Sequence, residues 1–434
     1  MPPARVSLSS LLLALMLSTS PTEADAQAIE RKDANYDESK VGEYTLPDPL
    51  LMANGKKVTT SWEWVSTRRG EILELFRTHV YGHTPPRVDA TRFELASVDP
   101  HALGNTATRK EITVHLTAEP DGPTMSVLLY VPNAAPKPVP AFLGPNFGGN
   151  QAVSKDPGIS LAKSWAKDDK EKHVVNSRVT EASRGSEASR WPIETILARG
   201  YALATIYYGD VEPDYAEGWK EGLRGALAKT GVKPEEWGAI AAWSYGLSRA
   251  LDYLEKDEDI DARHVAVIGH SRLGKTALWA GASDERFALV ISNDSGEGGA
   301  ALTRRNFGET TGIITKSFPH WFVPKYATYA GASDKLPIDQ HELIALIAPR
   351  PVYVASASED QWADPKGEFL SAKNAEPVYQ LFGKEGLGVS EQPPIDHPVG
   401  NFIGYHIRTG KHDVTDYDWA QYLNFADRHF KTAK

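Results

Sequence analysis

The chain has 434 residues, of which 41% are hydrophobic, a formal net charge of −10 and no cysteine. This apolar content is enough for a large core, so a disordered chain is not expected. The excess of acidic residues argues against general nucleic-acid binding, which needs a concentrated basic surface. The absence of cysteine excludes a catalytic thiol and a thiolate zinc site, and an exported form would rely on its core without disulfides.

The N-terminus has the pattern of a secretory signal peptide over residues 1–26. Arg5 supplies a short basic region, residues 11–17 form an apolar run, and Ala24-Asp25-Ala26 fits a cleavage site of small residues. That run is too short to span a bilayer, and no other run approaches the required length. We expect cleavage after Ala26 and a secreted or periplasmic protein without a membrane anchor; a disordered apolar tail is the alternative.

The rest of the chain alternates strand-like and helix-like segments. Residues 27–57 are polar and predict an extended arm, and residues 61–80 and 237–255 have the period of amphipathic helices. Residues 151–189 are polar without a period and predict a surface insertion. Short apolar runs predict strands over residues 111–116, 125–131, 141–143, 201–208, 265–268, 286–292 and 351–355. The alternation predicts an α/β fold, with a largely parallel sheet, helices on both faces, and one catalytic domain over residues 27–434.

One corner of this pattern carries chemistry. The strand over residues 265–268 leads into Gly269-His270-Ser271, and a helix follows at once. A strand that ends in Gly-x-Ser and turns directly into a helix is the nucleophile elbow of α/β-hydrolases. The second glycine of the usual G-x-S-x-G pattern stands one place late, at Gly274, so Leu273 occupies the place of a small residue. The alternative is that Ser271 only caps a buried helix.

A nucleophilic serine needs a histidine base and a carboxylate that orients it. His412 lies in a loop just before a terminal helix, where Thr415 and Asp418 resemble a capping box, and this is where the fold places its base. His397 and His406 are lesser candidates. For the acid we favour Asp360, at the end of the strand over residues 351–355.

Asp294 is the second candidate for the acid, because it ends the strand next to the nucleophile's strand. The alternative for either aspartate is a carboxylate that only stabilises a turn. No H-E-x-x-H or comparable spacing of histidines is present, so neither a metal nor a cofactor is expected.

These residues resemble a known family. The segment from Gly269 to Lys275, GHSRLGK, is similar to the G-C-S-R-x-G-K signature of glucuronoyl esterases, carbohydrate esterase family 15. Segments 293–296, 306–309, 360–365 and 410–413 fall in the family's order and rough spacing, and the resemblance extends over most of the chain from about Trp64. It implies an α/β-hydrolase with Ser271 as nucleophile and His412 as base.

The resemblance also assigns roles to other side chains. It implies that Arg272 stabilises the oxyanion and that Lys275, Glu309 and Trp362 contact the hydroxyls and ring of a glucuronate ester. The implied substrates are esters between 4-O-methylglucuronate on xylan and lignin alcohols. Two residues depart from the family. His270 replaces the signature cysteine, which fits a bacterial branch without that disulfide, and Asp294 is one methylene shorter than the family's common glutamate.

Other functions compete with this prediction. An acetyl xylan esterase or another serine hydrolase of the same fold would use the same elbow, but would have no reason to place Arg272 beside Lys275. Peptidases of this fold usually carry a substantial extra domain, for which the chain has no room. A non-catalytic carbohydrate-binding relative is disfavoured by the presence of Ser271, His412 and at least one acid. The sequence does not indicate an oligomeric state.

Overall fold

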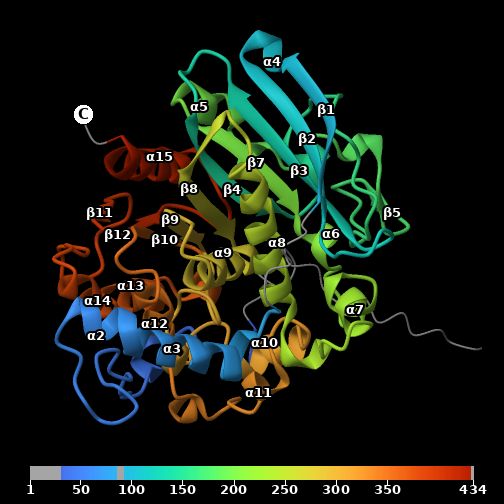
Figure 1. The fold of residues 1–434 in the computed structure, drawn as a ribbon. Coiled ribbons are helices and arrows are strands. Elements are labelled where there is room, and N and C mark those ends of the chain that lie inside the picture. Colours follow the sequence, from blue (N-terminus) through green and yellow to red (C-terminus); the bar gives the residue numbers. More distant parts are fainter. Residues whose placement is uncertain (1–30, 86–91, 432–434) are drawn as a thin grey trace, which may run out of the picture.

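The computed structural model describes residues 31–85 and 92–431, so the predicted signal peptide lies outside the described residues. Its main sheet has ten strands in the order β1-β2-β3-β7-β4-β8-β9-β10-β12-β11 (Figure 1). The strands from β7 to β12 along this order pair in parallel, and antiparallel pairs stand at the two edges. The strands are β1 Phe93–His101, β2 Ala107–His115, β3 Thr124–Pro132, β4 Val139–Asn146, β7 Ala202–Tyr207, β8 Ile260–His270, β9 Leu289–Asn293, β10 Val352–Ala357, β11 Val399–Gly400 and β12 Ile403–Arg408.

Helices follow most of the parallel strands, as the alternating pattern predicts. The bounds are α2 Ser61–Glu63, α3 Arg69–Phe76, α4 Ala102–Asn105, α5 Ile193–Ala198, α6 Tyr208–Val211, α7 Leu223–Ala228, α8 Ala239–Leu254, α9 Arg272–Ser283, α10 Thr311–Ser317, α11 Pro324–Ala327, α12 Gln340–Ala345, α13 Pro365–Asn374, α14 Glu376–Leu381 and α15 Asp416–Phe430. The mostly parallel sheet with helices on both faces confirms the predicted α/β fold class.

Two apolar clusters lie on the two faces of the sheet. Successive side chains of a strand point to opposite faces, and along β8 Val265 and Val267 join one cluster while Ala266 and Ile268 join the other. The first cluster includes α8, α9 and α12, and the second includes α5 and α15. Because both faces are covered, the central strands read as continuous apolar runs, which is typical of parallel sheets.

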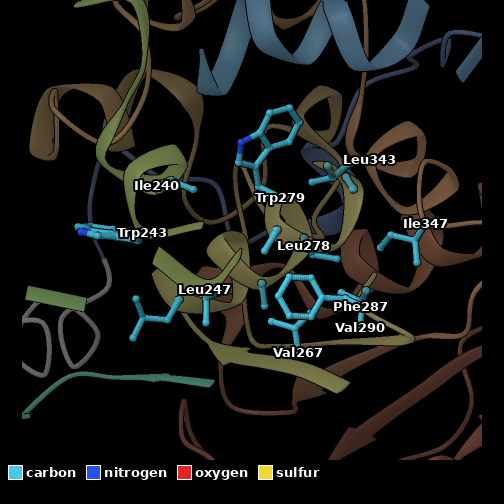
Figure 2. Close-up of a cluster of buried hydrophobic side chains, with 14 of the residues drawn as sticks. Ile240, Trp243, Leu247, Val267, Leu278, Trp279, Phe287, Val290, Leu343 and Ile347 are labelled. Carbon is cyan, nitrogen blue, oxygen red and sulfur yellow. The ribbon is translucent and has the colours of Figure 1, made fainter. Parts of the chain in front are cut away.

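The packing of α8 and α9 on the sheet fixes the helix that follows Ser271. Figure 2 shows side chains of α8, such as Leu247, beside Leu278 and Trp279 of α9, above Val267 of β8 and Val290 of β9. Trp279 is 1% exposed and stacks on Tyr81, with ring centroids 4.5 Å apart. Truncation of such a buried aromatic side chain typically costs about 3–5 kcal/mol of stability. The packing of Trp279 therefore fixes the position of α9, including its first turn.

The polar segments differ in detail from the sequence expectation. The segment over residues 151–189 consists mostly of turns with a small hairpin, β5 Val174–Val175 and β6 Arg178–Val179. Its first residues are buried, since Gln151 is 0% exposed and its amide donates to the backbone of Gly148. Strands β1 and β12 were not predicted, because β1 has mostly exposed side chains and His406 and Arg408 interrupt the apolar pattern of β12.

The N-terminal arm is bonded to the segment after β9 and to the start of α13. The carbonyl of Asn35 accepts from the amide of Gly308 at 2.8 Å, and Glu38 pairs with both Arg305 and Lys366. Within the part of the chain that the structure describes, no helix has the length and apolar character needed to cross a membrane.

Candidate active site

Ser271 lies at the turn between β8 and α9 in a strained backbone conformation. Its φ is 56° and its ψ is −129°, a region that L-residues with a side chain rarely occupy. Such a conformation costs about 1–3 kcal/mol and is typical of functional sites. The amide of Ser271 donates to the carbonyl of Asn293, at the end of β9, which ties the turn to the neighbouring strand.

Close backbone packing explains why the turn needs its glycines at these positions. A Cβ at Gly269 would lie 1.9 Å from the carbonyl oxygen of Leu273, and a Cβ at Gly274 would lie 2.9 Å from the Cβ of Ser295. The late second glycine therefore meets the end of β9, while Leu273 is fully buried. The amides of Gly274 and Lys275 donate to the carbonyl of Ser271, and the positive end of the α9 dipole favours negative charge beside Ser271.

The structure brings the predicted base and the favoured acid into contact. Nδ1 of His412 and Oδ2 of Asp360 lie 2.6 Å apart, and the carboxylate is 2% exposed. Within residues 31–85 and 92–431, Nε2 of His412 has no hydrogen-bond partner. It therefore makes no hydrogen bond to the hydroxyl of Ser271 in this structure. Catalytic hydrogen bonds are often long before substrate binds. An imidazole held at Nδ1 by a carboxylate has the orientation that a general base requires.

Asp294, the second candidate acid, lies in the same cluster without a hydrogen bond to His412. The ligand atoms of Asp294, Asp360 and His412 all lie within 4.8 Å of one another, and Arg408 is 3.6 Å from Asp294. Burial, together with the charge of Asp360, raises the pKa of Asp294 well above its usual value. These three side chains are close enough to one another to hold a metal ion, and Nδ1 of His412 is already hydrogen-bonded to Asp360.

The other histidines have different environments. His406, a lesser candidate for the base, is buried in β12 between the hydroxyl of Tyr353 and Asp418, and His397 is exposed. The ring centroid of His270 is 4.4 Å from that of His412, and its Nδ1 lies 2.6 Å from Oδ1 of Asn293. Burial lowers the pKa of His270 well below its usual value, and the charge of His412 adds to this effect.

Arg272 follows Ser271 in the chain, and its guanidinium is held by two rings and a carboxylate. Its Cζ lies 5.3 Å from the ring centroid of Phe147 and 5.2 Å from that of Trp321. Its Nη1 donates to Asp214 and lies 3.4 Å from the hydroxyl of Tyr208. Burial lowers the pKa of Arg272 to about 9, and a carboxylate in direct contact favours the charged form.

Asp214 was not predicted, although it joins several elements of the site. Its Oδ1 accepts from Nε2 of His320 and from Nε1 of Trp321, each at 2.7 Å, and its Oδ2 accepts from Tyr208 and Arg272. The only signal in the sequence is Pro213 before Asp214, which is typical of a turn and carries no chemistry by itself. The contacts of Asp214 with the site could therefore be recognised only from the structure.

The residues that match the family's sugar contacts are a buried pair, Lys275 and Glu309, and the partly exposed Trp362. Nζ of Lys275 donates to the carbonyl of Ser295 at 2.6 Å and lies 3.9 Å from Oε2 of Glu309. Burial raises the pKa of Glu309 to about 7, and the charge of Lys275 opposes this shift. A buried ammonium beside a carboxyl group offers donors and acceptors at one place, which suits sugar hydroxyls.

Trp362 is half-buried and lies on the loop to which the arm is fastened. Its carbonyl accepts from the amide of Glu309 at 3.0 Å, so the two predicted contacts are adjacent. Cζ of Arg31, in the arm, lies 5.8 Å from the centroid of the Trp362 ring. The sequence did not single out Arg31, because its partner comes from a distant part of the chain.

Comparisons with known proteins identify the family of the chain. The chain matches the family of fungal glucuronyl esterases over residues 220–383. Carbohydrate esterase MZ0003, from an unknown prokaryotic organism, is 48% identical over 422 residues, which are 96% of this chain and 97% of that protein.

Solved structures of bacterial proteins are similarly close. A glucuronoyl esterase from Solibacter usitatus is 52% identical, with a TM-score of 0.86, over 90% of this chain and all of the other. An esterase of carbohydrate esterase family 15 from a marine bacterial metagenome, described as promiscuous, is 49% identical, with a TM-score of 0.86, over 92% of this chain and all of the other.

Proposed function

Because the chain belongs to the glucuronoyl esterases of carbohydrate esterase family 15 and is a carboxylic ester hydrolase, we propose that it cleaves esters of glucuronic acid through Ser271, His412 and Asp360. The observation that carries this proposal is the strained serine at the turn from β8 to α9, with a histidine–carboxylate pair in the same region. This combination supports a mechanism of nucleophilic acyl transfer.

The proposed reaction has two steps. The hydroxyl of Ser271 attacks the ester carbonyl while Nε2 of His412 takes its proton, and the oxygen of the tetrahedral intermediate carries negative charge. Arg272 and the first-turn amides of α9 stabilise that charge. His412 then gives the proton to the leaving alcohol, and a water molecule, activated by the same imidazole, hydrolyses the acyl-enzyme.

Asp360 has a narrower role in this scheme. It accepts a hydrogen bond from Nδ1–H of His412, which fixes the tautomer that presents an unprotonated Nε2 to the serine. It also stabilises the imidazolium that forms during each attack. The contact of 2.6 Å between Nδ1 and Oδ2 is short enough for a charge-assisted hydrogen bond.

The acyl part of the substrate is proposed to bind at Lys275, Glu309 and Trp362. The ammonium and the carboxyl group would bind the ring hydroxyls of glucuronate, and the tryptophan would lie against the sugar ring. In an ester the uronate carries no charge at its carboxyl group, so recognition rests on hydroxyls and ring contacts.

The biological substrates are proposed to be ester cross-links between 4-O-methylglucuronoxylan and lignin alcohols. The pattern of a signal peptide over residues 1–26 supports this, because a polymer of that size must be met outside the cell. We therefore propose a secreted or periplasmic protein with its mature N-terminus near Gln27. Its domain organisation is proposed to be one catalytic unit over residues 27–434.

The test compares three substrates with purified mature protein. Benzyl glucuronate is expected to be hydrolysed with a kcat/KM at least about 100-fold above that for 4-nitrophenyl acetate, a difference of about 2.7 kcal/mol in transition-state binding. Acetate should not be released from acetylated xylan at a comparable rate. Similar kcat/KM values for both esters would favour an esterase of broad or acetyl specificity, and no turnover of any ester would favour a non-catalytic carbohydrate-binding protein.

A further inference from the structure

The carboxylate of Asp214 is held by more partners than an ordinary ion pair needs. It lies in the loop after α6 and its side chain is 4% exposed. Its two oxygens accept from four side chains: His320 and Trp321 of the loop after α10, Tyr208 of α6 and Arg272 of α9. A carboxylate accepts about four hydrogen bonds, so these donors use its capacity and fix its orientation.

The backbone that carries Asp214 is fixed as well. Two residues earlier, Glu212 is fully buried and is bonded by Arg224 through both Nε and Nη2. The carbonyl of Glu212 accepts from Nε1 of Trp243 on α8 at 2.9 Å. The position of the carboxylate is therefore determined by several elements and not by Arg272 alone.

Arg272 needs such a fixed partner if it acts on the oxyanion. An arginine side chain carries about 2 kcal/mol of rotamer entropy, which a mobile guanidinium would lose on reaching the transition state. The rings of Phe147 and Trp321 restrict the movement of the guanidinium, and Asp214 accepts a hydrogen bond from its Nη1. Electrostatic catalysis is strongest when such donors are oriented before charge develops.

We propose that Asp214 is a positioning residue for the reaction: it orients the guanidinium of Arg272 toward the oxyanion formed at Ser271. This inference rests on the proposed function, in which Arg272 stabilises that oxyanion. Asp214 also has an opposing effect, because its negative charge reduces the field that Arg272 exerts on the intermediate. The proposal requires that orientation of the guanidinium lowers the activation free energy by more than the screening raises it. If orientation dominates, loss of the Asp214 charge lowers kcat, and if screening dominates, the same loss raises kcat.

The first experiment replaces Asp214 by asparagine, which keeps the shape and removes the charge. With benzyl glucuronate, Asp214→Asn should lower kcat by about 10- to 100-fold and change KM by less than about twofold, since loss of a whole oxyanion donor costs about 10²–10³. The matched control is Asp210→Asn, a half-buried aspartate of α6 that accepts from the hydroxyl of Ser164 and the amide of Ser126. The control should keep kcat within about twofold of the wild type.

A second readout separates positioning from a structural role. If Asp214 acts through Arg272, then Asp214→Asn should lower kcat by less than about twofold when Arg272 is already alanine, because coupled residues are not additive. A purely structural effect would reduce kcat by the full factor in both backgrounds.

The outcomes distinguish this inference from the proposed function. Absence of wild-type turnover on benzyl glucuronate contradicts the proposed function, and the ratio of wild type to Asp214→Asn on 4-nitrophenyl acetate still tests Asp214. Unchanged or increased kcat in Asp214→Asn overturns the positioning role alone. If thermal unfolding shows that Asp214→Asn does not fold, Trp321→Phe is the alternative variant. It removes one donor to Asp214 and keeps an aromatic ring, and kcat should fall about three- to tenfold. An unchanged kcat in Trp321→Phe overturns the inference.

Discussion

The assignment of Asp360 and not Asp294 as the acid is open to a direct comparison of two isosteric changes. Asp360→Asn should lose far more activity than Asp294→Asn on benzyl glucuronate. Both aspartates lie in the same cluster, and both substitutions keep the volume of the side chain. The comparison therefore isolates what each carboxylate does for His412.

The magnitude for Asp360 follows from its hydrogen bond. Asparagine at this position would present either an amide N–H or a weaker acceptor to Nδ1 of His412, in place of a carboxylate oxygen at 2.6 Å. The corresponding change in a serine protease stabilises the wrong tautomer and lowers kcat by about 10⁴-fold. We expect a loss of the same order, about 10³- to 10⁴-fold, or about 4–5.5 kcal/mol in the activation free energy.

The smaller effect of Asp294→Asn follows from burial. Burial and the charge of Asp360 raise the pKa of Asp294, which disfavours its charged form, so loss of that charge should cost less here than at Asp360. Asp294 also makes no hydrogen bond to His412 among the described residues. We expect a loss of less than about tenfold, or about 1.4 kcal/mol.

The two changes should interact. Loss of the Asp360 charge lowers the pKa of Asp294, because that charge is one of the causes that raise it. An ionised Asp294 would then supply part of the missing stabilisation, so the double variant should be slower than Asp360→Asn alone. The assay is steady-state kinetics of all four proteins at about pH 7.5, with thermal unfolding as the control for folding. An equal or larger loss in Asp294→Asn would refute the assignment.

Three further predictions concern the rest of the site. The buried, neutral His270 should make the folded state less stable in acid, because the unfolded chain binds the additional proton below about pH 6.5. Urea unfolding should therefore show that the free energy of unfolding of the wild type, relative to His270→Asn, decreases by up to about 1.4 kcal/mol per pH unit below about pH 6.5. A difference that does not change with pH would contradict this prediction, and so would the same decrease relative to the variant of an exposed histidine, His397→Asn. Trp362→Ala should raise KM for a glucuronoxylan-derived ester about five- to tenfold and leave kcat within about threefold, and an unchanged KM would exclude its ring contact with the sugar. Gly269→Ala should destabilise the protein by about 3 kcal/mol, because its Cβ would lie 1.9 Å from the carbonyl oxygen of Leu273; a melting temperature within about 2 °C of the wild type would show that the turn can relax.

The central strands and the elbow could be predicted because their signals are local. Apolar runs marked the central parallel strands, and the strand–glycine–serine–helix order marked Ser271. The capping box of Thr415 and Asp418 marked the start of α15, and the structure contains both of its hydrogen bonds. These features depend on residues within one turn or one strand of each other.

The contacts of the site could be predicted only in part, because they join distant segments. Asp214 meets Arg272 across 58 residues and His320 across 106 residues, and no local pattern relates these positions. The same holds for Arg31 over Trp362. The pairing of His412 with Asp360, 52 residues apart, was predicted because the order of catalytic residues in this fold supplied what local spacing does not.

Covalent capture of the acyl-enzyme site tests the nucleophile most directly. A fluorophosphonate probe should add once to the wild-type protein, and peptide mapping by mass spectrometry should locate the adduct on Ser271. Ser271→Ala should take up no probe and should lose about 10⁶-fold in kcat, while His412→Ala should react far more slowly than the wild type. Labelling of another residue, or hydrolysis of benzyl glucuronate by Ser271→Ala at the wild-type rate, would contradict a mechanism based on this serine.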